Sequence, residues 1–172
     1  MSFLDKFLSW PPISRVRRNH ALEHATLQIM ARKRPTLMAA GYSDTNGFWV
    51  LGQVSTEELE EAVKEASARL RAGERQLAIH PNCGTNFVAA GAVAGTLAWL
   101  GMVGNRRGLR GDLERLPLLM SLVTLGIILA QPLGPILQSH VTVNPDIGDL
   151  KVVEIARLQR PDVMTHRVRT VD

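Results

Sequence analysis

The chain has 172 residues, 45% of them hydrophobic and 21% charged, a composition that excludes a disordered protein and a collagen-like repeat. Lysine and arginine number 20 against 16 acidic residues, so the formal charge is only +4. Aromatic residues make up 5%, too few for platforms that stack bases, and we expect no nucleic-acid partner. The single cysteine, Cys83, cannot form an intramolecular disulfide, so a disulfide-stapled secreted domain is also excluded.

The first ten residues predict a short amphipathic helix suited to a membrane interface. Phe3, Phe7 and Trp10 share one helical face. Pro11 and Pro12 are expected to end this helix.

The region that follows predicts a small mixed layer of helices and strands. In chain order, the predicted elements are a helix from Ser14 to Arg34, two strands between Leu37 and Val54, a helix from Ser55 to Gly73, and a short strand from Gln76 to Ile79. The residues from Asp44 to Gly47 are typical of a hairpin loop. Ser55 with Glu58 three residues later predicts a capping box.

Two uncharged apolar runs predict a transmembrane helical hairpin. They extend from Asn86 to Gly104 and from Leu116 to Leu137, each close to the roughly 20 residues that span a bilayer as a helix. Pro132 and Pro135 should kink or finish the second helix. The alternative is a buried helical hairpin in a soluble protein.

The expected partners of these helices are the lipid bilayer and another helix. Gly91 and Gly95 form a G-x-x-x-G spacing that allows close helix approach, and the second span is the expected neighbour. Four arginines between the spans oppose five basic residues on the outer flanks, so loop charge does not fix the orientation. The lack of a signal-peptide pattern and the basic residues farther upstream favour a two-span cell-membrane protein with cytoplasmic termini.

The chain becomes polar again after Gln138, and two further strands are predicted, from Leu150 to Arg157 and from Val163 to Val171. We expect them to join the amino-terminal layer. The sequence therefore predicts an α+β fold with a transmembrane helical hairpin, in which a helix-strand-strand-helix-strand layer is completed by carboxyl-terminal strands. Its expected regions are residues 1–85, 86–137 and 138–172.

The strongest chemical motif is H-x-x-E-H, formed by His20, Glu23 and His24 within a predicted helix. At 100 degrees per residue, these three side chains share the apolar face of that helix. Burying them without partners would cost several kcal/mol, and a metal ion would satisfy all three. The alternative is that the histidines bond to backbone and Glu23 pairs with Arg18 or Arg34.

A second dense cluster, residues 80–86, supplies a candidate third ligand. Two histidines and the Cys83 thiolate suit Zn²⁺ with an open fourth position, although these ligands also suit Fe²⁺ and Co²⁺. His80 is then an alternative ligand or a general acid. In the competing interpretation the cluster is a turn, Thr85 or Asn86 caps the following helix, and Cys83 is a small buried hydrophobe.

Three segments together resemble an uncharacterised family of small bacterial integral membrane proteins. They are RNHALEHAT near the start, HPNCGTN before the apolar runs, and VTVNPDIGDL after them. This resemblance covers most of the chain, and it implies a membrane location but no activity.

HALEH followed by Cys-Gly-Thr also resembles the metal site of S-ribosylhomocysteinase and other inverzincins. That resemblance implies that His20, His24 and Cys83 are ligands and that Glu23 is a base. The enzyme uses a second cysteine that this chain lacks. In pitrilysin-type peptidases the third ligand is instead a more distant glutamate, for which the residues from Glu57 to Glu74 offer candidates.

Two functional classes remain open from the sequence. The first is a membrane protein with a metal-dependent hydrolase or lyase site that acts on an unidentified small molecule or peptide. The second is a non-enzymatic membrane scaffold or interaction module in which the His/Glu cluster is structural.

Overall fold

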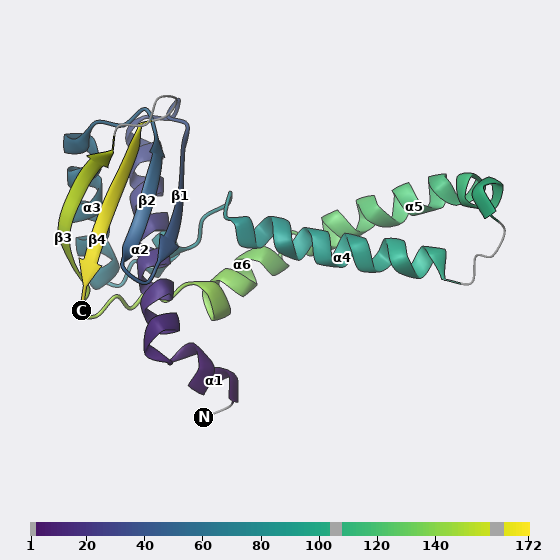
Figure 1. Ribbon diagram of the computed structural model, residues 1–172, viewed down its shortest axis with the longest axis horizontal. Coiled ribbons are helices and arrows are strands. Elements are labelled where there is room, and N and C mark those ends of the chain that lie inside the picture. Colours follow the sequence, from purple (N-terminus) through teal and green to yellow (C-terminus); the bar gives the residue numbers. More distant parts are fainter. Residues whose placement is uncertain (1–2, 104–107, 159–163) are drawn as a thin grey trace. The chain divides into compact units, whose positions relative to one another are not determined.

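Figure 1 shows the computed structural model, which describes residues 3–103, 108–158 and 164–172. The chain divides into two compact units. The sheet unit comprises Met1–His80 and Ser139–Asp172, and the helical unit comprises Pro81–Gln138.

The sheet unit is built on a four-stranded antiparallel sheet with the order β1-β2-β4-β3. Its strands are β1 (Ala39–Asp44), β2 (Gly47–Gly52), β3 (Lys151–Leu158) and β4 (Thr165–Val171). The predicted hairpin loop is confirmed, since Asp44 pairs with Gly47 at the β1–β2 turn. The carboxyl-terminal strands join this sheet as predicted, with β4 in the centre. Val163, the predicted start of the last strand, lies outside the described residues.

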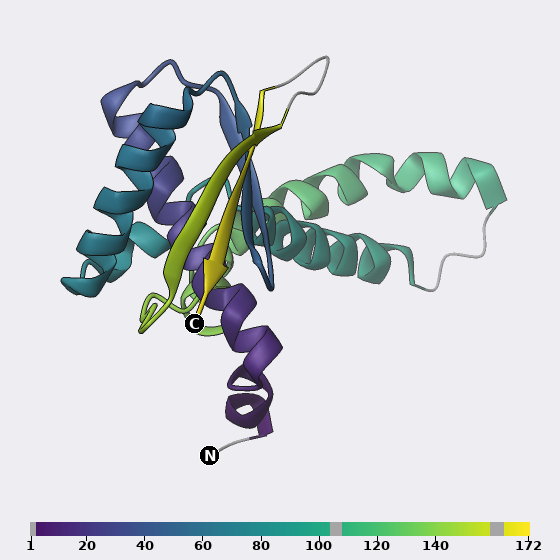
Figure 2. The ribbon, with the colours of Figure 1, turned by 60° about the vertical axis from the view of Figure 1, so that its left-hand side comes forward.

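Helices α2 (Pro11–Lys33) and α3 (Thr56–Arg71) cover one face of the sheet, as Figure 2 shows. Phe48 and Val50 of β2 and Val168 of β4 are fully buried in the core beneath them. Alternate side chains turn to the opposite face, where the Trp49 ring stacks on Tyr42. Within the described part of the sheet unit, no helix covers this opposite face of the sheet.

Local signals placed the two ends of α3 correctly. The capping box is confirmed, since Ser55 accepts a hydrogen bond from the Glu58 backbone and the Glu58 side chain accepts one from Ser55. Gly73, just beyond α3, has a φ of +92, a conformation that glycine adopts without strain.

The strand predicted from Gln76 to Ile79 is wrong, because the chain forms a 3₁₀ helix over Arg75–Ala78. Gln28 of α2 donates hydrogen bonds from its side-chain nitrogen to the carbonyls of Leu77 and Ile79, both at 2.8 Å. These carbonyls bond to a helix side chain and not to a neighbouring strand.

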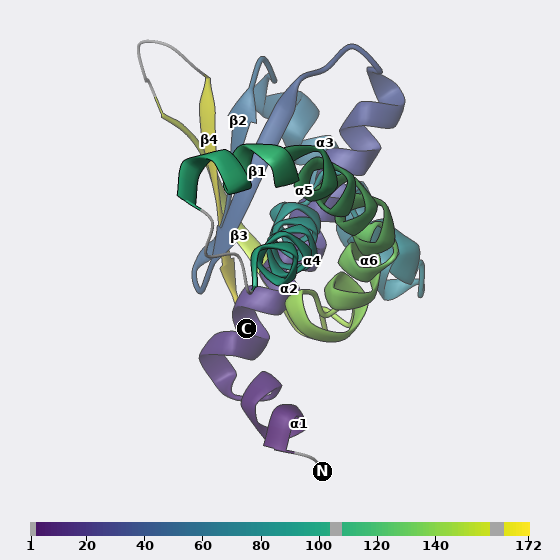
Figure 3. The same ribbon diagram turned by 90° about the vertical axis from the view of Figure 1, so that its right-hand side faces the viewer.

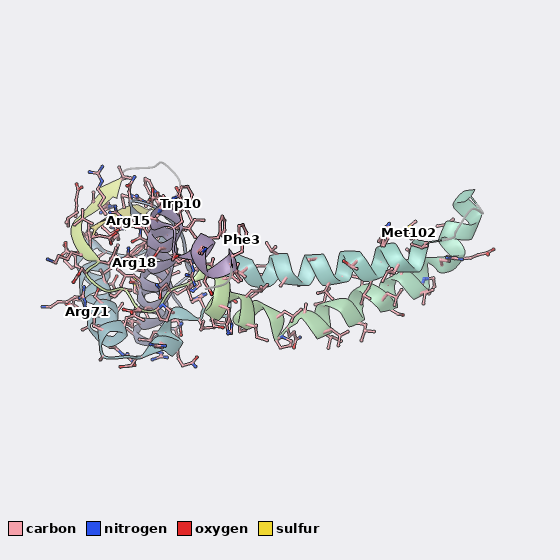
Figure 4. All side chains as sticks on the ribbon, turned by 90° about the horizontal axis from the view of Figure 1, so that it is seen from below. Phe3, Trp10, Arg15, Arg18, Arg71 and Met102 are labelled. Carbon is pink, nitrogen blue, oxygen red and sulfur yellow. The ribbon has the colours of Figure 1, made fainter. Side chains whose placement is uncertain are left out.

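A short helix precedes the long helix α2 at the amino terminus. Helix α1 (Phe3–Leu8) ends before the prolines, and Pro11 and Pro12 begin α2 at its first two positions, where proline is tolerated. The prediction that α2 starts at Ser14 is therefore short by three residues. Leu8 of α1 is buried, whereas Phe3, Leu4, Phe7 and Trp10 are exposed, and Figure 4 labels Phe3 and Trp10.

The helical unit consists of α4 (Gly84–Met102), α5 (Gly108–Ala130) and the short α6 (Leu133–Leu137), and Figure 3 views α4 nearly along its axis. Both α4 and the part of α5 from Leu113 are long and apolar enough to cross a membrane, and only 11% of each window is buried. The second run does not form one helix to Leu137 as predicted, because α5 ends at Ala130, before Pro132. Gly104, the predicted end of the first run, lies outside the described residues.

The contact between α4 and α5 uses small residues other than the predicted pair. A Cβ built on Gly126 of α5 would lie 2.7 Å from the Ala94 Cα of α4, so the two backbones approach closely there. A Cβ on Gly91 or Gly95 would meet no described atom within 4 Å. The second span is therefore not the neighbour of this glycine pair, and a helix partner at Gly91 and Gly95 stays a prediction.

Candidate metal centre

The H-x-x-E-H motif lies on the buried face of α2, as its spacing predicts. Glu23 and His24 are 3% and 2% exposed, and His20 is partly buried one helical turn away. The His20 and His24 rings lie edge to face with their centroids 4.2 Å apart. A carboxylate and two imidazoles are thus held together in the interior of the sheet unit.

Backbone carbonyls orient both imidazole rings. His20 Nδ1 lies 3.0 Å from the Thr142 carbonyl oxygen, and His24 Nδ1 lies 2.7 Å from that of Ala78. Because a carbonyl oxygen only accepts, each Nδ1 carries a proton and donates it. In the neutral ring the lone pair is then on Nε2, which is how metal-ligating histidines are usually held.

Glu23 is anchored by strand β1. Ser43 donates a hydrogen bond from Oγ to Glu23 Oε2 at 2.6 Å. The other carboxylate oxygen, Oε1, lies 2.7 Å from where a Cβ of residue 41 would be, so Gly41 leaves the space that Glu23 occupies. Strand and helix together fix the carboxylate beside the two histidines.

One half of the predicted alternative is confirmed, because both histidines bond to backbone carbonyls. The other half, an ion pair between Glu23 and Arg18 or Arg34, is wrong. Arg18 contacts Asp172 at 2.9 Å, and Arg34 contacts Glu58 at 3.3 Å. The carboxylate is therefore held by a neutral hydroxyl donor.

His80 lies at the end of the sheet unit, with its ring centroid 5.4 Å from that of His24. Burial, followed by the nearby charges of His24 and His20, lowers the pKa of His80 to about 4. Its imidazole is accordingly neutral at neutral pH. Its role as an alternative ligand or a general acid stays a prediction.

Cys83 follows His80 by three residues and is the N-cap residue of α4. Its thiol is buried and contacts Thr85 Oγ1 at 3.4 Å. His20, His24 and Cys83 each offer one ligand atom, and these atoms all lie within 4.8 Å of one another. A helix N-terminus also favours the negatively charged thiolate, the form of cysteine that binds metals.

The donor set fits a tetrahedral metal ion after a small adjustment. Zinc bonds of about 2.0–2.3 Å put ligand atoms roughly 3.6 Å apart, so closing a 4.8 Å separation takes side-chain shifts of about 1 Å. Within the described part of the chain, this ligand group includes no glutamate of α3, so the pitrilysin-type arrangement with a third ligand between Glu57 and Glu74 is not formed. Two histidines and one thiolate leave a fourth position for water or substrate.

Sequence reasoning missed the strand residues that hold Glu23. The signal was present in the small-residue alternation of β1, where Gly41 and Ser43 lie two positions apart and so share a face. Assigning that face to Glu23 needs the packing of β1 against α2, which no local pattern provides.

The comparisons with known proteins give a family but no activity. A family model described as a domain of unknown function, DUF6391, matches residues 15–155, which include the whole cluster and both apolar helices. An uncharacterized protein of Picosynechococcus sp. (strain ATCC 27264 / PCC 7002 / PR-6) is 40% identical over 98 residues, covering 49% of this chain and 48% of that protein. The chain thus spans about half the length of this relative. No solved structure matches the chain.

Proposed function

We propose that this chain, which belongs to the DUF6391 family of unknown function, is an integral membrane metalloprotein with a hydrolytic centre. In this proposal His20, His24 and Cys83 bind the metal and Glu23 is the general base. The α4–α5 hairpin anchors the centre in the cell membrane, with the sheet unit on the cytoplasmic side.

The observation that carries this proposal is the orientation of the two histidines. Each donates its Nδ1 proton to a backbone carbonyl from a different segment, at Thr142 and at Ala78. Two imidazoles fixed in this tautomer, with a thiol close to both, match the donor types that zinc binds. The same arrangement is ordinary around zinc.

Zinc at this site would supply a Lewis acid and an open coordination position. Glu23 takes a proton from the attacking water, whose oxygen bonds to the electrophilic carbon of the substrate. The bond to the leaving group breaks, and the proton held by Glu23 passes to that group. Ser43 and Gly41 are positioning residues, because they hold the carboxylate and do not touch the reacting atoms. A lyase would use the same carboxylate to remove a proton from carbon.

Metal content tests the proposal directly. Full-length protein purified in detergent under reducing conditions should carry about one metal ion per chain by elemental analysis. His24→Ala and Cys83→Ser should lose most of it, whereas Glu23→Gln should retain it. Cobalt-loaded protein should show a thiolate charge-transfer band that disappears in Cys83→Ser.

His140→Ala provides the matched control, because His140 is an exposed histidine whose Nδ1 contacts Ser139. This variant should keep its metal. Folded wild-type protein that remains metal-free after zinc addition would contradict the proposal. The cluster would then be a buried hydrogen-bond network, and the chain would belong with the membrane scaffolds.

A further inference from the structure

The cysteine of the candidate metal centre lies at the start of a membrane-length helix. Helix α4 has 19 residues, which at 1.5 Å each give about 28 Å, close to the roughly 30 Å of the bilayer hydrocarbon. With α4 across the membrane, Gly84 is at the hydrocarbon boundary. Cys83 is then at the level where lipid headgroups join their acyl chains.

The histidines are held near the same boundary by the covalent chain. His80 precedes Gly84 by four residues, which reach about 14 Å at most. Thr142, whose carbonyl accepts the His20 proton, follows the end of α6 at Leu137 by five residues, which reach about 18 Å at most. Both connections between the two units therefore tether the centre to the membrane surface.

Polar side chains join the two ends of the helical unit at this level. Asn86 donates a hydrogen bond to the Pro81 carbonyl at 2.5 Å, and Gln138 donates one to Asn86 Oδ1 at 2.7 Å. Gln138 is fully buried. These bonds hold the start of α4 against the end of α6. The two chain connections to the sheet unit therefore leave the helical unit close to one another.

A groove of about 490 Å³ lies within the helical unit, and Asn86 is one of its lining residues. Pro81 and Asn82, which directly precede Cys83, are among its lining residues. The rest of the lining is apolar at Phe87, Ala90, Ile127, Ala130 and Pro135 and polar at Asn86 and Gln131. The lining thus extends from the residue next to Cys83 to the membrane-length helices.

We propose that the substrate of this centre is a membrane lipid, with one acyl chain in the groove and its polar linkage at the metal. This inference rests on the proposed function. An acyl chain fits the apolar lining and the position of the groove between two helices that lipid surrounds. The metal centre, at the hydrocarbon boundary, meets the lipid where its polar linkage lies.

The mainly apolar lining of the groove favours a lipid over a peptide. An acyl chain has no polar groups to satisfy, whereas every backbone amide and carbonyl of a peptide needs a hydrogen-bond partner in an apolar surrounding. A juxtamembrane peptide is the competing occupant that the experiments must separate.

Cobalt substitution tests whether lipid reaches the metal. The full chain is loaded with Co²⁺ and reconstituted into phosphatidylcholine vesicles, and the ³¹P relaxation of the lipid is measured. Because paramagnetic relaxation falls with the sixth power of distance, wild-type protein should relax the phosphates several-fold more than Cys83→Ser, which controls for adsorbed Co²⁺. If the wild-type protein binds Co²⁺ but relaxes the lipid phosphates no more than Cys83→Ser does, the lipid proposal alone is overturned. Wild-type protein that binds no Co²⁺ overturns the proposed function together with it.

Filling the groove tests the occupant. Ala90→Trp places a large side chain in the groove, whereas Ala92→Trp adds the same volume at an exposed position about 200 degrees around α4. Native mass spectrometry should show a lipid bound to the wild type and to Ala92→Trp, and several-fold less bound to Ala90→Trp. Equal lipid binding by the two variants overturns the groove as the lipid site. Combined with equal relaxation by the wild type and Cys83→Ser, it leaves a juxtamembrane peptide as the occupant.

Discussion

Helices α2 and α5 have the same length, 23 residues, but they distribute polar and apolar side chains in opposite ways. In α2, four polar side chains are almost completely buried: Asn19, Glu23, His24 and Thr26. In α5, large apolar side chains are exposed, with Met120 at 63% and Ile128 at 55%. The polar helix is in the interior and the apolar helix is at the surface.

Each arrangement is unfavourable for a protein alone in water. A buried carboxylate costs several kcal/mol unless it is paired, and exposed apolar surface costs about 25 cal/mol per Å². Asn19 is satisfied inside the chain, since it donates a hydrogen bond to the Asp44 carbonyl and accepts one from Thr170. In the proposed function, a metal ion would stabilise the His/Glu cluster of α2, and lipid would cover the apolar surface of α5.

The largest expected effect comes from placing a charge on the exposed side of α5. Met120→Arg puts a guanidinium near the middle of the apolar window from Leu113 to Ala130. An arginine at the centre of a membrane helix costs about 3 kcal/mol, which shifts insertion by roughly a hundredfold. The fraction that resists carbonate extraction should fall sharply, whereas Met120→Leu should behave as the wild type. Wild-type protein recovered without detergent in the soluble fraction would show that the apolar surface of α5 has another cover.

A smaller effect is expected where β1 meets the buried carboxylate of α2. In Gly41→Ala the new Cβ would lie 2.7 Å from Glu23 Oε1 and 2.8 Å from the Trp49 carbonyl oxygen, so the strand or the carboxylate must move. We expect a loss of about 2 kcal/mol in the free energy of unfolding, measured by chemical denaturation in detergent. Adding Glu23→Ala should recover part of the loss, because it removes one of the two clashes. Unchanged stability of Gly41→Ala would mean that Glu23 is not held as described.

The features that sequence predicted well depend on neighbouring residues. The capping box at Ser55 and the turn after Asp44 are each decided within four residues, and both are confirmed. The inner position of His20, Glu23 and His24 follows from helical periodicity alone. The local pattern of α2 was therefore sufficient to indicate a polar cluster in the core.

The features that sequence missed depend on contacts between distant segments. The residues before His80 form a 3₁₀ helix because Gln28, about fifty residues earlier, binds their carbonyls. Ser43 reaches Glu23 only because β1 packs on α2. Such pairings are set by tertiary packing, which overrides a short apolar pattern like that of Gln76 to Ile79.

The smallest effect on stability is expected at the contact between α4 and α5, which involves Gly126 but not Gly95. In Gly126→Ala the new Cβ would lie 2.7 Å from the Ala94 Cα, so the helices must separate slightly. In Gly95→Ala it would meet no described atom within 4 Å. Both changes replace glycine by alanine within a helix, so the gain in helix propensity cancels when the two variants are compared.

The free energy of unfolding should be about 1 kcal/mol lower for Gly126→Ala than for Gly95→Ala. The difference is small because lipid can fill a small gap between membrane helices more readily than a protein core can. Unfolding by SDS can be followed through Trp99 of α4 in a background of Trp10→Phe and Trp49→Phe. Loss of stability in Gly95→Ala instead would mean that the G-x-x-x-G face of α4 is occupied by a second helix. Part of the exposed apolar surface would then be covered by protein, and the contrast between α5 and α2 would be smaller than the single chain indicates.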